Sequence, residues 1–236
     1  MRFDKTITPK ELLVKSPFIY EVVGSYYPFF LKRKDEEYWS YNGIVEITNL
    51  IDSNIVNEVN LKKNWDEKIG LQLQNKLNLK VRGATLGLVP NYGGIVELVE
   101  KNNGLAVELH FYVSFLVNIY SIQIVYLRDD MVVERPQSFL EPIVTKGIEK
   151  LVISPVEYEF YNEFKLVESF IEANFNNPIF LPFALEKLRL KGLEVTYKDE
   201  ENCMIGDAFF HKAFPINYGL GNIPNIIGDE NYKGER

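Results

Sequence analysis

One histidine and two carboxylates are spaced so that a single strand pair could bring them together. Glu97 and His110 lie on either side of Asn102-Asn103-Gly104, and Glu108 precedes His110 by two residues. Asn-Gly supplies the positive φ angles that a type I′ turn needs, so the segment predicts a β-hairpin. With Asn103-Gly104 at the centre of the turn, Glu97 pairs with His110 across the strands. Glu108 then lies beside His110 on the same face.

This arrangement supports two interpretations. A neighbouring carboxylate favours the charged form of a histidine, and three such groups could bind a divalent metal or transfer a proton. The same pattern describes a cross-strand ion pair on a solvated face, which stabilises a fold by at most about 1 kcal/mol. The geometry depends on register, because a four-residue loop would put Glu97 opposite Glu108. Glu97, Glu108 and His110 are thus candidate acid–base residues, with the surface ion pair as the simpler interpretation.

Signatures of the common enzyme classes are absent from the sequence. There is no Gly-rich phosphate loop, no Gly-x-Ser-x-Gly elbow, no His-Glu-x-x-His and no Cys-x-x-Cys pair. His211 has Asp207 nearby and could titrate, but it follows an apolar run, and Cys203 has no cationic neighbour in sequence. Both are interpreted as packing residues. No cofactor or metal is predicted, no stretch carries the motif of a known family, and the balance is against an enzyme.

A second candidate site is aromatic. Two tyrosines precede the mixed-charge turn at residues 32–37, and three more aromatic residues follow it. Tyrosine and tryptophan are frequent anchors of protein interfaces, because each combines a large apolar ring with a hydrogen-bonding group. Packing in the core or at a sheet edge is at least as good an interpretation. The candidate partner-binding residues are Tyr26, Tyr27, Tyr38, Trp39 and Tyr41.

The elements that must position these residues are organised around residues 105–127, the longest apolar, β-branched and aromatic run in the chain. Up to Ile119 the odd positions are apolar, whereas from Ile122 the even positions are, so the strand period changes phase near Asn118. The run is either one bulged strand or two strands meeting near Asn118. The absence of Gly and Pro favours the bulge.

The remaining segments predict strands mainly in the first part of the chain and helices later. Helices are predicted at residues 9–16, 61–77, 138–154, 157–175 and 182–191. For residues 61–77 the alternation of apolar residues and the presence of Gly70 also allow a strand. Strands are predicted at residues 18–23, 26–31, 41–47, 95–100, 131–134, 193–197 and 204–211, with a loop at 82–94 that could hold a short strand at 85–89. The heptapeptides at 41–47 and 92–98 are similar, and chance or the shared requirements of a turn that enters a strand explain this better than a duplicated module.

Together these elements predict one α+β domain over residues 1–214. Its largely antiparallel sheet comes from the N-terminal half, and its C-terminal helices pack on one face. A chain of 236 residues is long enough for a sizeable core. Residues 215–236 contain several Gly and Pro residues, so they are predicted to form an irregular arm or a partly disordered tail.

Charge and composition narrow the class of partner. The net charge is −7 and the Lys and Arg residues are scattered, which argues against nucleic acid. The uncharged residues 111–127 alternate like a strand and contain polar interruptions, so no membrane association is predicted. A single cysteine, and an N-terminus without signal-peptide features, favour a cytoplasmic location.

These features favour a non-enzymatic acidic binding protein that acts by surface complementarity, such as an immunity or inhibitor protein that occludes a basic partner protein. Two alternatives stay open. One is a small-molecule or metal-assisted hydrolase that uses Glu97, Glu108 and His110. The other is a structural or assembly subunit that uses the tail from Pro215 as an arm on a neighbouring copy. The oligomeric state is open under all three hypotheses.

Overall fold

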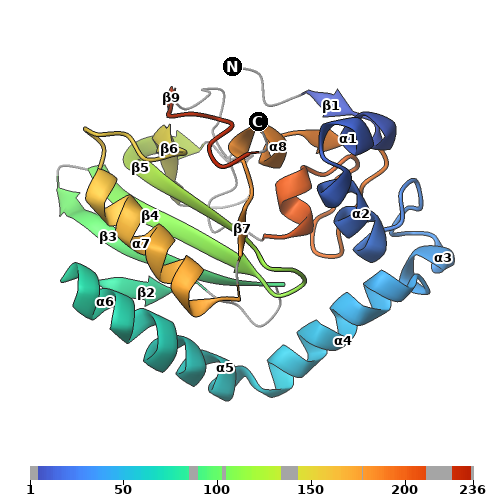
Figure 1. Ribbon diagram of the computed structural model, residues 1–236, viewed down its shortest axis with the longest axis horizontal. Coiled ribbons are helices and arrows are strands. Elements are labelled where there is room, and N and C mark those ends of the chain that lie inside the picture. Colours follow the sequence, from blue (N-terminus) through green and yellow to red (C-terminus); the bar gives the residue numbers. More distant parts are fainter. Residues whose placement is uncertain are drawn as a thin grey trace.

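The centre of the fold is a seven-stranded, largely antiparallel sheet (Figure 1). The computed structural model describes residues 5–84, 90–102, 105–133, 143–176, 178–210 and 225–234. The strand order is β2-β3-β4-β5-β6-β9, and β7 pairs with β5 beside this path. Helices precede and follow the sheet in the sequence, so the predicted α+β class is confirmed.

The strands of this sheet are β2 (Val81–Gly83), β3 (Asn91–Asn102), β4 (Leu105–Ser114), β5 (Ile119–Val133), β6 (Ile143–Val152), β7 (Ile179–Phe180) and β9 (Asn225–Ile227). β7 runs parallel to β5 and β9 runs parallel to β6, whereas the other pairs are antiparallel. A separate parallel pair joins β1 (Thr6–Ile7) to β8 (Arg189–Leu190).

The apolar run at residues 105–127 forms two strands, so the single bulged strand that we favoured is wrong. β4 and β5 are antiparallel neighbours joined by a turn at residues 115–118. Val113 lies opposite Tyr120, and directly opposite residues share a face of the sheet. Odd residues of β4 and even residues of β5 therefore point to the same side. The change of phase in the sequence is this exchange between two strands.

The helices are α1 (Pro9–Lys15), α2 (Pro17–Tyr26), α3 (Glu36–Trp39), α4 (Asn42–Val56), α5 (Glu58–Trp65), α6 (Leu71–Leu77), α7 (Tyr161–Asn174) and α8 (Phe183–Glu186), with a π-helical turn η1 (Asp66–Gly70) and a 3-10 turn η2 (Ile205–Ala208). The helices predicted at residues 9–16, 61–77 and 157–175 are confirmed. α1 begins with the predicted capping box, in which the side chains of Thr8 and Glu11 each accept a hydrogen bond from the other's backbone N–H.

Three strands predicted before residue 50 are wrong. Residues 27–31 of the second form a bend and a turn, and the other two segments are helical, because helical burial outweighs their β-branched and aromatic composition. α2 covers residues 17–26, has Pro17 in its first turn, and buries Ile19 and Val23 one turn apart. α4 covers the strand predicted at residues 41–47 and buries Ile44 and Ile47. The similar heptapeptide at residues 92–98 lies in β3, so the two copies adopt different structures. Their similarity is not that of a duplicated module.

The helix predicted at residues 138–154 is also wrong where it can be compared. Residues 143–152 form β6, which supplies the backbone partners that the long edge of β5 needs. Residues 131–133 continue β5 and do not form a separate hairpin strand. Residues 134–142 lie outside the described residues.

Several smaller corrections concern loops and the C-terminal segment. Residues 91–94 of the predicted loop begin β3, whereas the short strand expected at 85–89 lies outside the described residues. The helix predicted at 182–191 divides into α8 and β8. The strands predicted at 193–197 and 204–211 are wrong over the described residues, because 193–197 is irregular and 205–208 forms η2, both held by local backbone hydrogen bonds. Residues 225–227 of the predicted irregular tail form β9, and residues 211–224 lie outside the described part.

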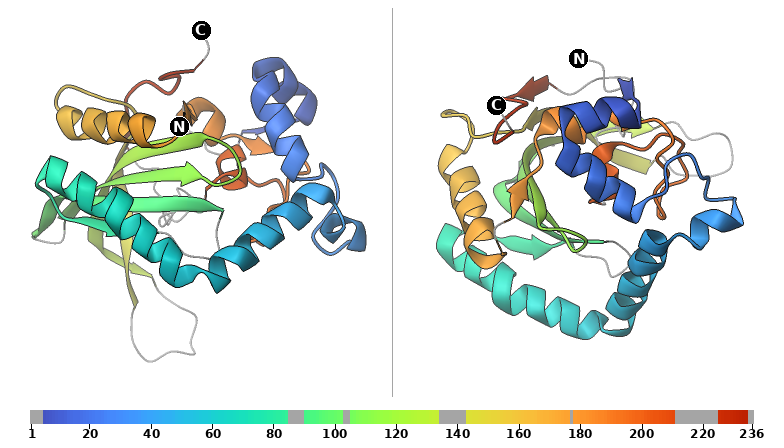
Figure 2. Two further views of the ribbon diagram at one scale, coloured as in Figure 1. Left: turned by 60° about the horizontal axis from the view of Figure 1, so that its bottom comes forward. Right: turned by 45° about the vertical axis from the view of Figure 1, so that its right-hand side comes forward.

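Three clusters of buried hydrophobic residues hold the described elements together, and two of them are large. In the first, Phe164 and Ile171 of α7 and Leu73 of α6 pack on the face of the sheet that carries Leu109 and Phe111. α6 precedes strands β2 to β6 in the sequence and α7 follows them, yet both helices pack on this face (Figure 2). The second core joins α1, α2 and α4 to residues 181–210, which include α8, β8 and η2. The second core contacts the other sheet face through Tyr112 of β4.

Gly43 sets how closely α4 approaches α2. A Cβ at this position would lie 2.2 Å from the Ser25 carbonyl oxygen and 2.4 Å from the Tyr26 Cα. Because these are backbone atoms, the two helices must separate, and we expect Gly43→Ala to lower the free energy of unfolding by roughly 1–3 kcal/mol. Urea denaturation measures the change. Gly24→Ala is the control, since its Cβ would meet only the Phe29 ring, at 3.3 Å, and should cause no loss. Equal stability of the two variants would contradict the close approach.

Candidate functional site

The predicted hairpin of β3 and β4 forms, but its register shifts along the strands. Asn102 lies opposite Leu105, as predicted next to the turn. Two irregularities, between Val99 and Asn102 and between Glu97 and Val99, then move the partners along. As a result Glu97 lies opposite Glu108 and is not the cross-strand partner of His110. The prediction of that pair is wrong because bulges leave no mark in the alternation of the sequence.

Glu108 and His110 nevertheless meet, in a buried row of polar side chains along β4. The Arg82 Nη2 atom lies 2.8 Å from Glu108 Oε1, and Glu108 Oε2 lies 2.8 Å from His110 Nε2. His110 Nδ1 lies 3.2 Å from the Tyr112 hydroxyl. Glu108, His110 and Tyr112 are 5%, 1% and 1% exposed. The row therefore begins at Arg82 near the surface and ends in the interior.

Glu97 belongs to the outer end of the same row. Arg82 Nε lies 3.6 Å from Glu97 Oε1, and Lys80 Nζ lies 3.0 Å from the same oxygen. Arg82 thus lies between two carboxylates that face each other across β3 and β4, which offsets their mutual repulsion. The sequence reasoning missed Arg82, because its position beside Glu108 depends on the pairing of β2 with β3.

The electrostatics of Glu108 keep it ionised. Burial alone would raise the pKa of Glu108, but hydrogen bonding and charge interactions with His110 and Arg82 outweigh burial and lower it below 4.5. If His110 donates its Nε2 proton to this carboxylate, Nδ1 of the neutral ring accepts the Tyr112 hydroxyl proton. Both ring nitrogens are then engaged with neighbouring side chains. The arrangement orders a sheet face, and it leaves His110 little capacity to act as a general base.

A second buried carboxylate lies on the same face of the sheet. Glu186 of α8 accepts hydrogen bonds from the Ser121 hydroxyl at 2.8 Å and from Gln123 Nε2 at 3.0 Å. Gln123 lies opposite His110, and Ser121 lies opposite Tyr112. No periodicity of the sequence links Glu186 to these residues. In the described part of the chain, no group of three or more His, Cys, Asp or Glu side chains is arranged to hold a metal ion.

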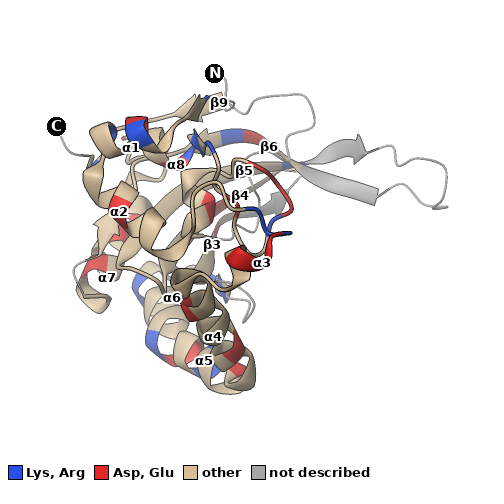
Figure 3. Cartoon of the chain, turned by 90° about the vertical axis from the view of Figure 1, so that its right-hand side faces the viewer, with Lys and Arg blue, Asp and Glu red and all other residues tan. Residues whose placement is uncertain are grey.

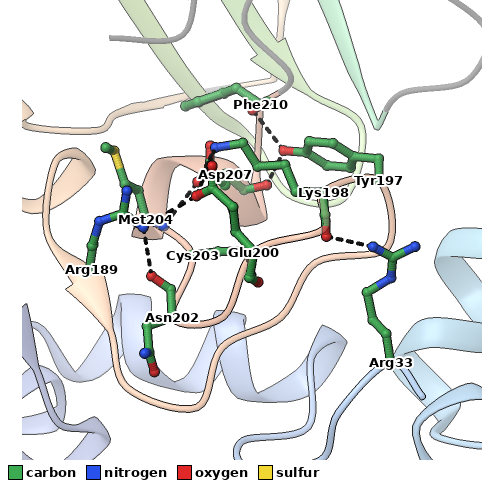
Figure 4. A network of polar contacts seen from close by, with 10 residues as sticks. All are labelled: Arg33, Arg189, Tyr197, Lys198, Glu200, Asn202, Cys203, Met204, Asp207 and Phe210. Carbon is green, nitrogen blue, oxygen red and sulfur yellow. Dashed lines mark hydrogen bonds and ion pairs between the residues drawn. The ribbon is translucent and has the colours of Figure 1, made fainter. Parts of the chain in front are cut away.

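A separate polar network fixes the irregular segment after β8 (Figure 4). Asp207 accepts hydrogen bonds from Lys198 Nζ and from the Met204 backbone N–H, each at 2.9 Å. Burial raises the pKa of Asp207, although Lys198 opposes that change. Arg33 donates to the Lys198 carbonyl at 2.6 Å, which ties this segment to the chain after α2. These bonds serve mainly backbone groups of an irregular loop and indicate a structural role.

Cys203 lies inside this loop, where its thiol donates to the Glu200 carbonyl at 3.3 Å. Burial raises the pKa of Cys203 to about 11, and the side chain has no solvent exposure. We therefore expect no reaction with a chromogenic disulfide reagent at pH 7 in the folded protein and one equivalent of thiol after unfolding. Rapid labelling of the folded protein would contradict the burial of Cys203. Its predicted packing role agrees with this position, and His211 lies outside the described residues.

The five candidate partner-binding aromatics divide into buried and exposed positions. Tyr27 and Tyr38 are 1% and 0% exposed, and their hydroxyls donate to the carbonyls of Ala208 and Glu194. Tyr26 and Tyr41 are half-buried and donate to the carbonyls of Leu116 and Gly24. Trp39 is 46% exposed, and its Nε1 donates to the Arg33 carbonyl at 2.7 Å. Of the five, Trp39 offers the largest accessible ring to a partner.

Trp39 lies within an acidic segment that the sequence reasoning did not single out. Residues 35–61 contain no Lys or Arg, and their acidic residues are Asp35, Glu36, Glu37, Glu46, Asp52 and Glu58. These residues account for six of the seven net negative charges of the chain. Figure 3 marks acidic positions in red on the ribbon of α3 and on the helices α4 and α5, which overlap in that view. A charge count over a sliding window would have found this segment.

Comparison of the chain with protein-family models, with curated proteins and with solved structures finds no match. Among the residues that the structure describes, no helix combines the length and the apolar character needed to cross a bilayer.

Proposed function

We propose that this protein is a non-enzymatic binding protein that occludes a basic partner protein, as an immunity or inhibitor protein does. The observation that carries the proposal is the concentration of negative charge in residues 35–61. No ion pair joins these six carboxylates to another described residue. A field of one sign steers an oppositely charged partner and raises its association rate.

The geometry gives less support to a hydrolase. Glu108 and His110 are enclosed, and their polar atoms are engaged with each other, with Arg82 and with Tyr112. Glu97 is bound to two cations at the end of the row. A site built from these residues would have to open before a substrate could reach the imidazole.

The assembly-subunit alternative also loses part of its support. The described end of the tail packs on its own chain: β9 pairs with β6, and the Tyr232 ring packs edge-on against Phe164 and Phe180. All of these contacts are made within one molecule. Residues 225–234 are therefore not free to act as an arm on a neighbouring copy.

The test is native mass spectrometry of the protein purified from its own cells at low ionic strength. We expect a stoichiometric complex with one basic protein, which dissociates as salt is raised because salt screens the attraction between the two surfaces. The hydrolase alternative is tested in parallel by comparing the hydrolytic activity of His110→Ala with that of the unsubstituted protein. Recovery of the protein without a partner, or with an acidic one, would refute the proposal.

A further inference from the structure

We propose that residues 35–61, termed the acidic arm, form the docking surface, and that the partner presents an apolar groove bordered by Lys and Arg. This inference rests on the proposed function and adds the place and the mode of binding. The acidic arm consists of α3, α4 and the beginning of α5. It follows the outer edge of the molecule in Figures 1 and 2, where α4 runs away from α2 to meet α5 at a bend.

Apolar side chains are exposed along the arm. Val56 and Val59 at the bend are 84% and 82% exposed, and Ile55 is 44% exposed. Val45 and Trp39 are 41% and 46% exposed nearer the body of the protein. These five residues lie on α3, α4 and α5. Single exposed apolar residues are ordinary, whereas a group of them is typical of an interaction surface. The arm thus offers apolar contacts together with its charge.

The spacing of these residues fits recognition of a helix face. Val45, Asp52 and Val56 are separated by seven and by four residues, so they lie on one side of α4. An amphipathic helix that inserts into a groove uses anchors at this spacing. On α4 the anchor row includes a carboxylate, and Glu46 and Glu58 flank it in the sequence. A groove that accepts this row needs an apolar floor and a basic border.

Within the acidic arm, burial is confined to the part before residue 48, which leaves the second half of α4 available. Gly43, Ile44 and Ile47 are the buried residues of α4, and all three belong to its first two turns. None of residues 48–56 is buried, although Leu50, Ile51 and Asn54 are partly covered. The second half of α4 therefore contributes little to the core. A helix that is maintained with this little burial has a surface free for another molecule.

Site-specific photocrosslinking in the cells of origin tests the docking surface. Benzoylphenylalanine replaces Val56 or Val59 in the arm, or Tyr158 as a matched control that is 90% exposed outside it. We expect one basic protein to form an adduct from Val56 and Val59 and not from Tyr158. An adduct with a second copy of this chain would overturn the inference in favour of self-association.

Charge variants give an independent measurement with the partner so identified. The arm variant combines Glu46→Gln, Asp52→Asn and Glu58→Gln, and the control combines Glu21→Gln, Glu157→Gln and Glu163→Gln. Each set removes three negative charges, so the net charge of the two proteins is equal. We expect the arm variant to slow association at low salt by about tenfold or more, and the control by less than about twofold. Equal slowing would show that only net charge matters and would overturn the inference.

The outcomes separate the two proposals. Adducts with a basic protein from Tyr158 but not from the arm would overturn the docking surface and leave the proposed function in place. Absence of a basic partner in native mass spectrometry would overturn both, whereas a basic partner found there that forms no adduct from any of the three positions would overturn the docking surface alone. Circular dichroism and urea denaturation of every variant confirm that a lost adduct does not reflect unfolding.

Discussion

Glu108→Leu is expected to lower the free energy of unfolding by about 3 kcal/mol, measured by urea denaturation at pH 7. Leucine removes the acceptor of the buried His110 Nε2–H, and an unsatisfied buried donor costs about 1–3 kcal/mol, with bonds to charged groups at the upper end. Arg82 adds little, because its side chain is 43% exposed and can rehydrate. His110 cannot, since its side chain is only 2% exposed. The loss therefore arises mainly at the imidazole.

Glu97→Leu is the matched control for that variant. Glu97 lies directly opposite Glu108 and contacts the same arginine, but its side chain is 21% exposed and has Lys80 as a second cation. Its removal should cost less than about 1 kcal/mol, as for other ion pairs near the surface. Similar losses of unfolding free energy for the two variants would show that the burial of the carboxylate does not decide how much it stabilises the fold.

The same carboxylate predicts how stability depends on pH. The pKa of Glu108 is lower in the folded protein than its ordinary value of 4.5. The unfolded chain therefore takes up the proton first, and stability falls as the pH decreases from about 4.5 through the lowered pKa. Glu108→Gln should flatten this part of the profile of unfolding free energy against pH. An unchanged acid limb in Glu108→Gln would contradict the assignment.

Glu168→Leu is expected to lower the free energy of unfolding by about 3 kcal/mol and to release the C-terminal segment. Glu168 on α7 is 1% exposed, and its carboxylate contacts Lys165 and lies 3.0 Å from Lys233 Nζ. The Tyr232 hydroxyl donates to it at 3.1 Å. Although burial by itself lowers the pKa of Lys233, its bonds to Glu172 and Glu168 raise it overall. Leucine leaves two lysines and a hydroxyl without this acceptor.

Hydrogen exchange gives the local measurement for this variant. Residues 225–234 should exchange faster in Glu168→Leu, because β9 and Tyr232 lose their fixed contacts with β6 and α7. The control is Glu172→Leu, which removes a carboxylate that is 42% exposed and also bound to Lys233. It should cost about 1–2 kcal/mol, because it also removes the acceptor of the Tyr120 hydroxyl, and it should leave the exchange of β9 nearly unchanged. Release of the segment in both variants would mean that Lys233, and not the buried carboxylate, anchors it.

Local sequence patterns correctly predicted the elements that are specified by interactions between residues a few positions apart. The capping box of Thr8 and Glu11 determines where α1 begins, and the apolar spacing along residues 157–175 predicts α7. Asn-Gly predicts the hairpin and the pairing of Asn102 with Leu105. In each case the energy that specifies the structure comes from residues a few positions apart.

The same patterns failed where burial by distant residues decides the structure. Tyr41-Asn42-Gly43-Ile44-Val45-Glu46-Ile47 lies mostly in α4, yet its near copy at residues 92–98 is part of β3. One packs its small and branched residues on α2, and the other pairs with β4. β-Propensity is a weak preference of about 1 kcal/mol per residue, which such packing readily exceeds. The seven residues by themselves therefore do not determine whether the segment forms a helix or a strand.

The candidate sites show the same division. The sequence by itself determined that Glu108 and His110 share a strand face, that the chain is acidic, and that residues 35–61 carry most of the net charge. Only the tertiary structure decided that bulges move Glu97 away from His110, that Arg82 bridges the two carboxylates, and that Tyr27 and Tyr38 are buried while Trp39 is exposed. The physical reason is that charge and alternation are properties of the chain. Register, burial and ion pairing instead depend on contacts between segments that the sequence holds apart.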